Sequence, residues 1–139
     1  MYKKILHATD LSENHYTLCQ QAMNIAKCFQ AKLSLIHVIE IPSSIQLAQS
    51  LGFMELVKPL KDQGVATLNI VGESLGILPQ SQYVEIGSIK THIINKINEL
   101  GFDLIIIGSH TPSHLPNFLS STAHMLTNHV PCDVLTIRS

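Results

Sequence analysis

Histidine is the residue type whose abundance first suggests chemistry in this chain. Eight histidines are spread over 139 residues, at His7, His15, His37, His92, His110, His114, His124 and His129. His110 and His114 stand four residues apart, the spacing of a zinc-binding pair on one helix, but Pro112 between them prevents a shared helical face. No carboxylate or thiolate stands at ligand spacing beside them. We therefore predict no metal site, and we interpret His37, inside an apolar run, as a hydrogen-bonded core histidine.

The three cysteines give no better support for catalysis. Cys19, Cys28 and Cys132 form no CxxC motif, which is typical of a chain kept in a reducing compartment. None has a base nearby in the sequence, and no G-x-S-x-G elbow is present to expose a nucleophilic serine. Cys132 follows Pro131 just before an apolar run and is predicted to belong to the core. We expect a protein without enzymatic activity.

Short apolar runs alternate with helical patterns along the chain. Continuous runs of this kind are typical of strands buried on both faces of a parallel sheet. The segment 44–78 is less regular, and we expect a loop there and then a long helix within 57–75, although Pro59, Gly64 and Gly72 interrupt the helical pattern. Elsewhere, strands are predicted at residues 5–9, 33–39, 82–86, 104–107 and 134–137, and helices at 15–29, 89–100 and 118–129.

Polar residues and a glycine mark the ends of the predicted helices. Ser12 and Asn14 offer side-chain oxygens that would cap the helix over 15–29. Gly101 follows the helix over 89–100, at the position where a left-handed residue commonly ends a helix. Capping side chains and a terminal glycine therefore support the boundaries that the spacing of apolar residues predicts for these two helices.

Strands and helices in this order predict an open parallel five-stranded sheet with helices on both faces. This is a Rossmann-like α/β fold, and we expect one domain over residues 1–139. In such a sheet, ligands bind at the carboxyl ends of the strands, where the strand order reverses. Residues 9–11, 38–41 and 108–112 should therefore border any site.

The composition excludes several classes of protein. With 45% hydrophobic and 14% charged residues, the chain is too apolar and too sparsely charged for intrinsic disorder. Nine Lys and Arg against ten Asp and Glu give a net charge of −1, and no basic stripe predicts a nucleic-acid partner. No apolar run approaches the ~20 residues of a membrane helix, and no signal peptide follows Met1. We expect a soluble cytoplasmic protein with neither a membrane nor a nucleic acid as partner.

Four segments together resemble the universal stress protein family. They are residues 4–13, 31–38, 102–110 and 130–135, and they follow one another in the order and spacing of that family. The resemblance spans the whole chain, with residues 44–81 similar only in length and character. It implies a five-stranded α/β domain similar to the adenine nucleotide alpha hydrolases. It also implies a homodimer that responds to stress through an unknown protein partner.

The family has two branches, of which one binds ATP and the other, the universal stress protein A type, lacks the binding motif. The ATP-binding branch carries G-x-x-G, about nine residues, and then G-S or G-T, whose backbone N–H groups surround the phosphates. Here Gly108 is kept, but the second glycine position is Thr111, followed by Pro112, which has no N–H to donate. The third position is Ser120 or Ser121, depending on the direction of counting. The motif therefore resembles that of the non-binding branch, and we expect no nucleotide cofactor.

Parts of a nucleotide site nevertheless remain, and they keep open a second interpretation, an ATP-binding regulator that uses Mg²⁺. By resemblance, Asp10 matches the nucleotide-contacting aspartate and the backbone of Val38 matches the adenine contact. Hydroxyls at the start of the last helix could hold an anion, or they could simply cap the helix. Asp10 could equally orient the turn after the first strand. The candidate nucleotide-binding residues are Thr9, Asp10, Val38, Gly108, Ser120, Ser121 and Thr122.

The predicted last strand offers a surface for self-association. It is apolar, and if it lies at an edge of the sheet its unpaired backbone groups invite a second copy in an isologous two-fold dimer. The resemblance implies the same interface. The alternative is a monomer whose edge is guarded by Asp133 and Arg138. The candidate interface residues are Val134, Leu135, Thr136 and Ile137.

Overall fold

The protein is described here by a computed structural model that covers residues 1–41, 53–109 and 119–138. Within these residues, five parallel strands form one open sheet in the order β3-β2-β1-β4-β5. The order reverses between β1 and β4, because the chain runs outward from β1 to β3 and then returns to the other side of β1. The strands are β1 (Lys4–Ala8), β2 (Lys32–Ile39), β3 (Gln82–Ile86), β4 (Leu104–Ser109) and β5 (Asp133–Arg138). The predicted Rossmann-like fold class is confirmed.

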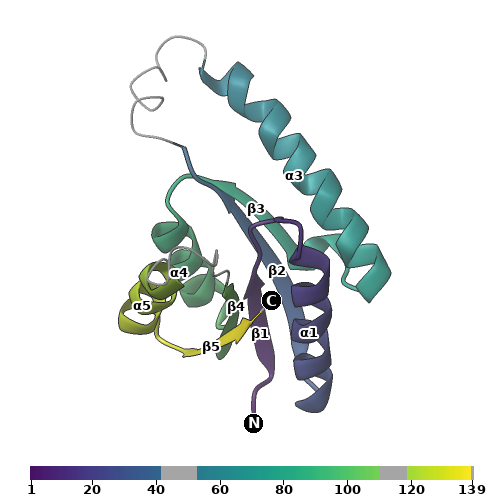
Figure 1. Cartoon of the computed structure of the whole chain (residues 1–139), viewed down its shortest axis with the longest axis vertical. Helices are drawn as coiled ribbons and strands as arrows, with labels where there is room; N and C mark the ends of the chain where they lie inside the picture. Colours follow the sequence, from purple (N-terminus) through teal and green to yellow (C-terminus); the bar gives the residue numbers. More distant parts are fainter. Residues whose placement is uncertain (42–52, 110–118, 139) are drawn as a thin grey trace.

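Helices cover both faces of this sheet (Figure 1). Helix α1 (His15–Cys28) and helix α3 (Phe53–Leu75) pack on one face, and helix α4 (Ile89–Leu100) and helix α5 (Leu119–His129) pack on the other. A short 3₁₀ turn, η2 (Pro79–Ser81), leads from α3 into β3. Of the helices in the described ranges, none has the length and apolar character that a bilayer crossing requires.

Two apolar layers result, because successive side chains of a strand point to opposite faces. In β1, Ile5 belongs to the cluster under α1 and α3, whereas Leu6 belongs to the cluster under α4 and α5. In β4, Ile106 belongs to the cluster under α1 and α3, and Ile105 belongs to the cluster under α4 and α5. All four side chains are fully buried. The continuous apolar runs of β1 and β4 are thus explained by burial on both faces.

The predicted helix ends are confirmed for α4 and only in part for α1. Gly101 adopts φ 72° and donates its N–H to the Ile97 carbonyl, which ends α4. Asn14 precedes α1 without a side-chain cap bond, so the expected capping by this residue is wrong. The backbone carbonyl of Ser12 instead accepts the N–H of His15 at 2.9 Å, which satisfies part of the helix start.

Helix α3 passes through Pro59, Gly64 and Gly72, the residues that interrupt its pattern. The two glycines allow close packing rather than breaking the helix. A Cβ at Gly64 would lie 3.3 Å from Val84 Cγ1, and one at Gly72 would overlap the amide of Gln82. The expected loop before this helix lies largely outside the described residues, as do His110, Thr111 and the rest of the turn that follows β4.

Candidate functional site

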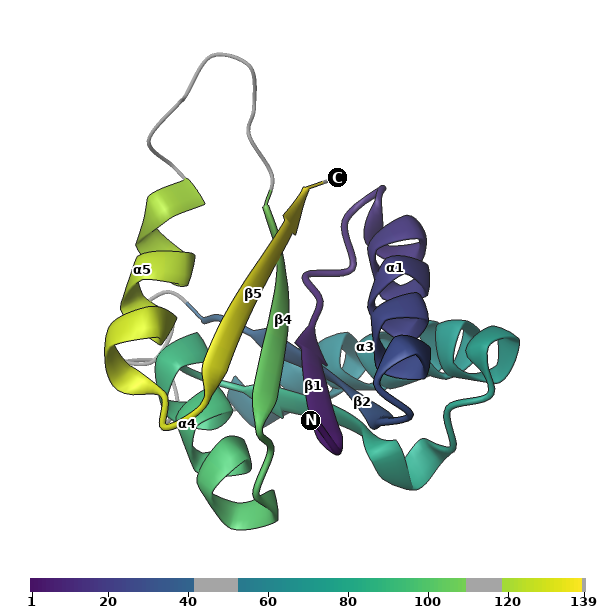
Figure 2. The same cartoon turned by 90° about the horizontal axis from the view of Figure 1, so that it is seen from below.

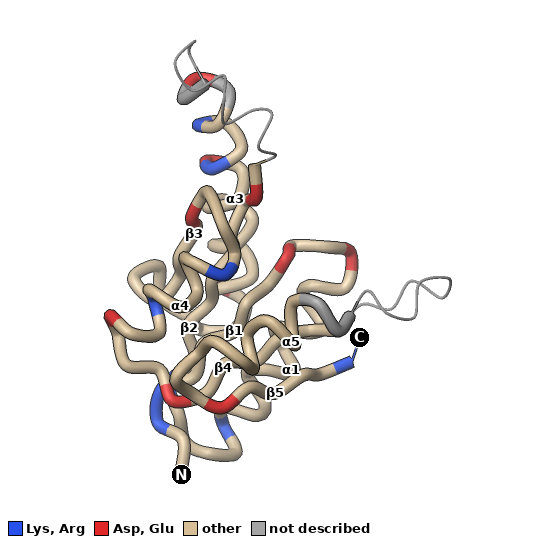
Figure 3. The backbone as a smooth tube through the Cα atoms, turned by 90° about the vertical axis from the view of Figure 1, so that its left-hand side faces the viewer, with Lys and Arg blue, Asp and Glu red and all other residues tan. Residues whose placement is uncertain are grey.

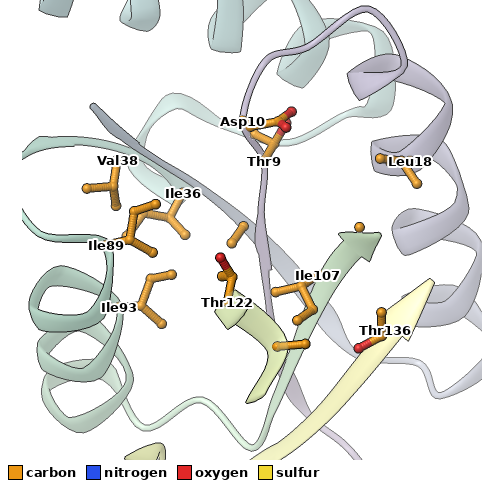
Figure 4. Close-up of a pocket in the computed structure, with 13 residues that line it drawn as sticks. Thr9, Asp10, Leu18, Ile36, Val38, Ile89, Ile93, Ile107, Thr122 and Thr136 are labelled. Atoms are coloured by element: carbon orange, nitrogen blue, oxygen red, sulfur yellow. The ribbon is translucent and has the colours of Figure 1, made fainter. Parts of the chain in front are cut away.

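A cleft of about 280 Å³ opens at the carboxyl ends of β1, β2 and β4, where the strand order reverses. The topology therefore places a hollow at the predicted position. Figure 4 shows its walls, with side chains from four strands and from α1, α4 and α5. The described residues that line it are Ala8, Thr9, Asp10, Leu18, Ile36, Val38, Ile89, Ile93, Ile107, Gly108, Thr122, Ala123 and Thr136.

One wall of the cleft is apolar. Ile36 and Val38 come from β2, and Ile89 and Ile93 come from the first turns of α4, one helical turn apart. In Figure 4 these four side chains form a group on one side of the hollow, with Thr122 between them and Ile107. Such a wall suits a flat apolar group such as a heterocyclic ring, and it offers no charge to an anion.

The turn after β1 holds Asp10 at the rim of the cleft. Leu11 adopts φ 56°, a conformation that costs a residue with a side chain roughly 1 kcal/mol. The Leu11 N–H donates to Thr9 Oγ1 at 3.2 Å, and the Ser12 N–H donates to Asp10 Oδ1 at 2.9 Å. Thr9 and Asp10 therefore organise the strained turn, which directly supports the interpretation of Asp10 as a turn-forming residue.

Gly108 has a packing role in the cleft floor. A Cβ at this position would lie 2.6 Å from Leu18 Cδ1, closer than real side chains approach one another. Leu18 is itself buried on α1. The glycine at this position leaves room for the Leu18 side chain, whether or not a phosphate binds. The glycine on which the resemblance to the ATP-binding branch depends is explained without a nucleotide.

The hydroxyl residues of α5 are only partly placed. Thr122 lines the cleft, and Figure 4 shows its hydroxyl directed into the hollow. Ser120 and Ser121 belong to the first turn of α5, and their side chains lie outside the described residues. Thr136, predicted as an interface residue, also lines the cleft, because alternation along β5 turns it toward α5.

The described residues that line the cleft offer no positive side chain to a polyanion. Among the described lining residues, Asp10 carries the one formal charge, and none is Lys or Arg. Figure 3 shows the charged residues scattered over the fold, with both signs along α3. A triphosphate placed at this rim would meet a carboxylate without a side-chain cation supplied by the described residues.

Most histidines of the described residues lie within hydrogen-bond distance of a backbone carbonyl. His7 is fully buried, with Nδ1 3.0 Å from the Ile106 carbonyl. Burial lowers the pKa of His7 to about 4, so its ring is neutral at physiological pH. His37 Nδ1 lies 2.8 Å from the Thr9 carbonyl, which confirms the predicted hydrogen-bonded histidine. In the described ranges, no three His, Cys, Asp or Glu residues gather as metal ligands.

The thiols of Cys19 and Cys132 are held in their unreactive form. Burial raises the pKa of each thiol to about 11, so both remain protonated near neutral pH. Cys132 is half-buried against the apolar cluster under α4 and α5, in agreement with its predicted place in the core. Cys28 is exposed at the end of α1.

Sequence reasoning found the polar rim of the cleft and missed its apolar wall. Ile89 and Ile93 fall within the helix predicted over 89–100, and nothing in its pattern separates a cleft wall from ordinary core. Leu18 falls within the helix predicted over 15–29, and its contact with Gly108 depends on where α1 lies against the sheet. The i, i+4 spacing of Ile89 and Ile93 is the one signal that they share a face.

Comparison with known proteins gives consistent matches over the full length. The chain matches the Universal stress protein family over residues 1–138. It is 32% identical over 139 residues to Universal stress protein A homolog 2 of Coxiella burnetii, covering 99% of this chain and 95% of that protein. It is 30% identical over 142 residues to a putative universal stress protein of Staphylococcus haemolyticus, covering 99% and 86% of the two chains.

Solved structures match in the same way. Universal stress protein UspA from Lactobacillus plantarum has a TM-score of 0.70 and 25% identity, covering 99% of this chain and 98% of that one. A universal stress protein solved in complex with cAMP has a TM-score of 0.70, 17% identity, and coverage of 99% and 97%. At that identity, the second likeness concerns the fold alone.

Proposed function

This chain belongs to the universal stress protein family, and from that premise we propose that it acts as a stress-response homodimer through protein contacts, without binding ATP. The observation that carries the proposal is a contrast between two regions. The cleft presents an apolar wall and a carboxylate where a triphosphate needs positive charge. The strand β5 presents an open sheet edge with apolar side chains.

The edge strand β5 supports the dimer. Figure 2 shows β5 as the outermost strand, with α5 beside it and α1 lying next to β1 instead. Leu135 is 36% exposed, and Val134 and Ile137 are half-buried. An edge strand with exposed apolar side chains favours pairing with a second copy, and a two-fold axis would bring the same residues of both copies together.

The charges at the ends of β5 fit such a pairing. In an antiparallel arrangement about a two-fold axis, residues directly opposite each other lie on the same face of the sheet, so Asp133 and Arg138, which point to opposite faces, are not direct partners. The ends of the two strands still lie side by side, which places Asp133 of one copy about one residue from Arg138 of the other. The two residues that could guard the edge of a monomer would thus attract each other in the dimer.

Sedimentation equilibrium tests the dimer. We expect the wild-type chain to have the mass of two subunits at micromolar concentration, and Leu135→Lys to have the mass of one, with an unchanged circular dichroism spectrum. Ile70→Lys is the matched control, because Ile70 is 69% exposed on α3, away from β5, and its replacement should leave the dimer intact. A wild-type chain with the mass of one subunit contradicts the proposal.

Titration calorimetry with ATP and Mg²⁺ tests the second part. We expect no saturable heat up to about 1 mM nucleotide, which corresponds to a binding free energy weaker than about −4 kcal/mol. ATP binding with a micromolar dissociation constant in the wild type, and loss of that binding in Asp10→Ala, would contradict this expectation. Asp103→Ala, a carboxylate far from the cleft that accepts the N–H groups of Lys3 and Lys4, is the control for a general change of charge.

Nucleotide-dependent regulation is the second candidate function, and the cleft itself favours it. Its apolar wall could hold a base near the Val38 backbone, with Asp10 at the sugar and Thr122 near an anion. The relative solved with cAMP binds a nucleotide with the same fold. ATP would then bring its own Mg²⁺, and the titration described above decides between the two functions.

The proposed role includes no catalytic step. Among the described residues, the buried His7 and the protonated thiols of Cys19 and Cys132 lack the accessible base or thiolate that nucleophilic catalysis uses. We therefore propose that the protein acts by binding other protein chains through its surface.

A further inference from the structure

The opposite edge of the sheet, β3, has a regular set of outward backbone groups. The Gly87 N–H donates to the Ile39 carbonyl at 2.9 Å, and the parallel register pairs Ile39 with Ile86. In a parallel ladder, alternate residues bond to the same neighbour, so Tyr83, Glu85 and Gly87 face β2. The backbone groups of Gln82, Val84 and Ile86 therefore point away from the sheet.

Both ends of this outward row are already satisfied. The Gln82 N–H donates to the Pro79 carbonyl, which closes the row at the start of β3. At the other end, His92 Nε2 lies 2.9 Å from the Ile86 carbonyl. Four groups remain between them without a partner in the described residues: the Gln82 carbonyl, the Val84 N–H and carbonyl, and the Ile86 N–H. These four groups form a slot of fixed length.

Helix α3 forms a roof over the slot. A groove of about 270 Å³ runs between α3 and the β3 edge. Its helical side carries Asp62, Val65, Ala66 and Asn69, which recur at the spacing of one helix face. Val65 is 48% exposed there. Figure 1 shows α3 running alongside β3 and extending past it, and the groove between them reaches Gln82 and Val84 of β3, where an added strand would lie.

The slot is preformed. Gln82 donates from Nε2 to the Ile77 carbonyl at 2.9 Å, and its amide occupies the space that the missing side chain of Gly72 leaves. Gly64 brings the α3 backbone close to Val84. The distance between helix and strand is therefore fixed before any partner arrives, which lowers the entropic cost of binding.

We propose that this slot, bounded by Pro79 and His92 and roofed by α3, binds an extended peptide segment of a partner protein as a sixth strand. A strand is the occupant whose backbone satisfies a row of alternating N–H and carbonyl groups, which neither a helix nor an apolar ligand does. As the place of the protein contacts proposed above, the slot rests on that function.

The lining of the groove specifies the side chains of the segment. A small or β-branched residue fits between Val65, Ala66 and Val84. Asp62 carries the one formal charge among the described lining residues, and no ion pair in the described ranges involves it. The segment therefore alternates apolar residues and carries a Lys or Arg that faces Asp62.

The first test selects peptides with the full-length protein. A phage library displays random heptapeptides, and we expect enriched sequences to alternate apolar residues and to include Lys or Arg. These peptides should bind Ile86→Pro more weakly by more than about tenfold, because the proline removes an outward N–H and blocks the slot. Ala66→Trp, which fills the groove from the exposed side of α3, should weaken binding similarly.

Two outcomes of this selection overturn the proposal: a library that yields no enriched peptide, and peptides that bind both variants as well as they bind the wild type. Leu135→Lys is the control that separates the two proposed surfaces. It should bind the peptides with unchanged affinity even as a monomer, so failure of the β5 dimer and failure of the β3 slot are distinguishable.

Amide hydrogen exchange gives a second readout that needs no variant. In the free protein, the Val84 and Ile86 N–H groups should exchange quickly, whereas those of Tyr83 and Glu85 should be protected by β2. A selected peptide should slow exchange at Val84 and Ile86. Protection of these two groups in the free protein that grows with its concentration would show that a second copy occupies the slot, and would overturn the proposal.

Discussion

The two edges of the sheet differ in how much of each is already enclosed. Strand β5 is open along its length, with exposed Leu135 on its surface and opposite charges at its two ends. Strand β3 is closed at both ends by Pro79 and His92 and is overhung by α3. A broad edge with complementary ends suits a second copy, whereas a short roofed edge suits a narrow segment. We therefore propose two kinds of protein contact for the two edges of one sheet.

Proline substitutions in β3 test the assignment of inward and outward groups, and they should give the largest effect. Glu85→Pro removes an N–H that bonds to β2, and we expect a loss of about 3 kcal/mol in the free energy of unfolding. Ile86→Pro removes an outward N–H, and the loss should stay below about 1 kcal/mol. Urea unfolding followed by circular dichroism measures both.

A control is needed because Glu85 also pairs with Lys96, at 3.5 Å. Glu85→Ala removes this partly exposed ion pair and keeps the backbone N–H, so its effect should be small. Equal losses for the two prolines would mean that the outward row of β3 is wrongly assigned, and the contrast between the edges would fall with it.

Acidification should affect both edges together, because both depend on the central strand β1. The pKa of buried His7 is lowered to about 4 in the folded chain, from 6.5 when it is unfolded. The folded state therefore excludes a proton that the unfolded state binds. The stability that neutral His7 gives the folded state is therefore complete above pH 6.5 and is lost as the pH falls toward 4. At pH 5 the free energy of unfolding should have fallen by about 2 kcal/mol.

His7→Asn isolates this contribution. The asparagine keeps a donor for the Ile106 carbonyl and does not titrate, so the difference in unfolding free energy between wild type and variant should shrink or reverse as the pH falls. The protection factors of the amides that bond within the sheet in β3 and β5, which correct for the slower intrinsic exchange at low pH, should fall in parallel between pH 6.5 and 5. If one edge opens at a higher pH than the other, the edges do not share a common support.

The sequence was sufficient for the strands, their order along the chain and the end of α4 at Gly101, because these depend on local patterns of burial and turn chemistry. It also placed Asp10 and Val38 at a cleft, since strand ends in this topology have a fixed location. It could not reveal the slot at β3. The outward row depends on the register of β3 against β2, and the roof depends on the path of α3.

Thr136 and Gly108 also have structural roles that the sequence pattern did not reveal. Thr136 stays a predicted interface residue, and its place in the wall of the cleft was not foreseen. Gly108 was assigned to a phosphate motif, and its contact with Leu18 gives it a packing role. Both roles depend on the distance between elements far apart in the chain, which periodicity does not contain.

A mutant cycle tests whether the packing between α3 and β3 prepares the slot. Gly72→Ala introduces a Cβ that overlaps the Gln82 amide, and it should destabilise the fold by about 1–2 kcal/mol despite the better helix propensity of alanine. Gln82→Ala should remove the closest part of this overlap and leave the Ile77 carbonyl at 2.9 Å from the new Cβ. The double variant is therefore expected to be more stable than the sum of the single losses predicts and less stable than Gln82→Ala alone.

Ala66→Gly is the reference for this cycle, because it changes helix propensity on the same helix at an exposed site. If the losses in the free energy of unfolding simply add, the Gln82 side chain moves away from the new Cβ at no cost. The β3 edge would then be adaptable rather than preformed, and it would resemble β5 more closely than we propose.

The smallest effect is expected for the charges at the ends of β5, because they are exposed. Arg138→Asp would bring like charges close to each other at both ends of the paired strands, and should weaken dimerisation by about three- to tenfold in low salt. Asp133→Arg combined with Arg138→Asp should restore it. Sedimentation at two salt concentrations measures the shift, which should shrink as salt screens the charges.

Tyr2 supplies the control for this exchange, since its hydroxyl donates to Asp133 Oδ2 at 2.6 Å within one chain. Tyr2→Phe removes that bond without changing a charge, and the dimer should hardly respond. If Tyr2→Phe weakens the dimer as much as Arg138→Asp does, Asp133 acts through the fold of its own subunit. If the double exchange fails to restore the dimer, the strands do not pair in the antiparallel register that brings these two residues together, and the complementarity that distinguishes β5 from β3 must come from its apolar side chains alone.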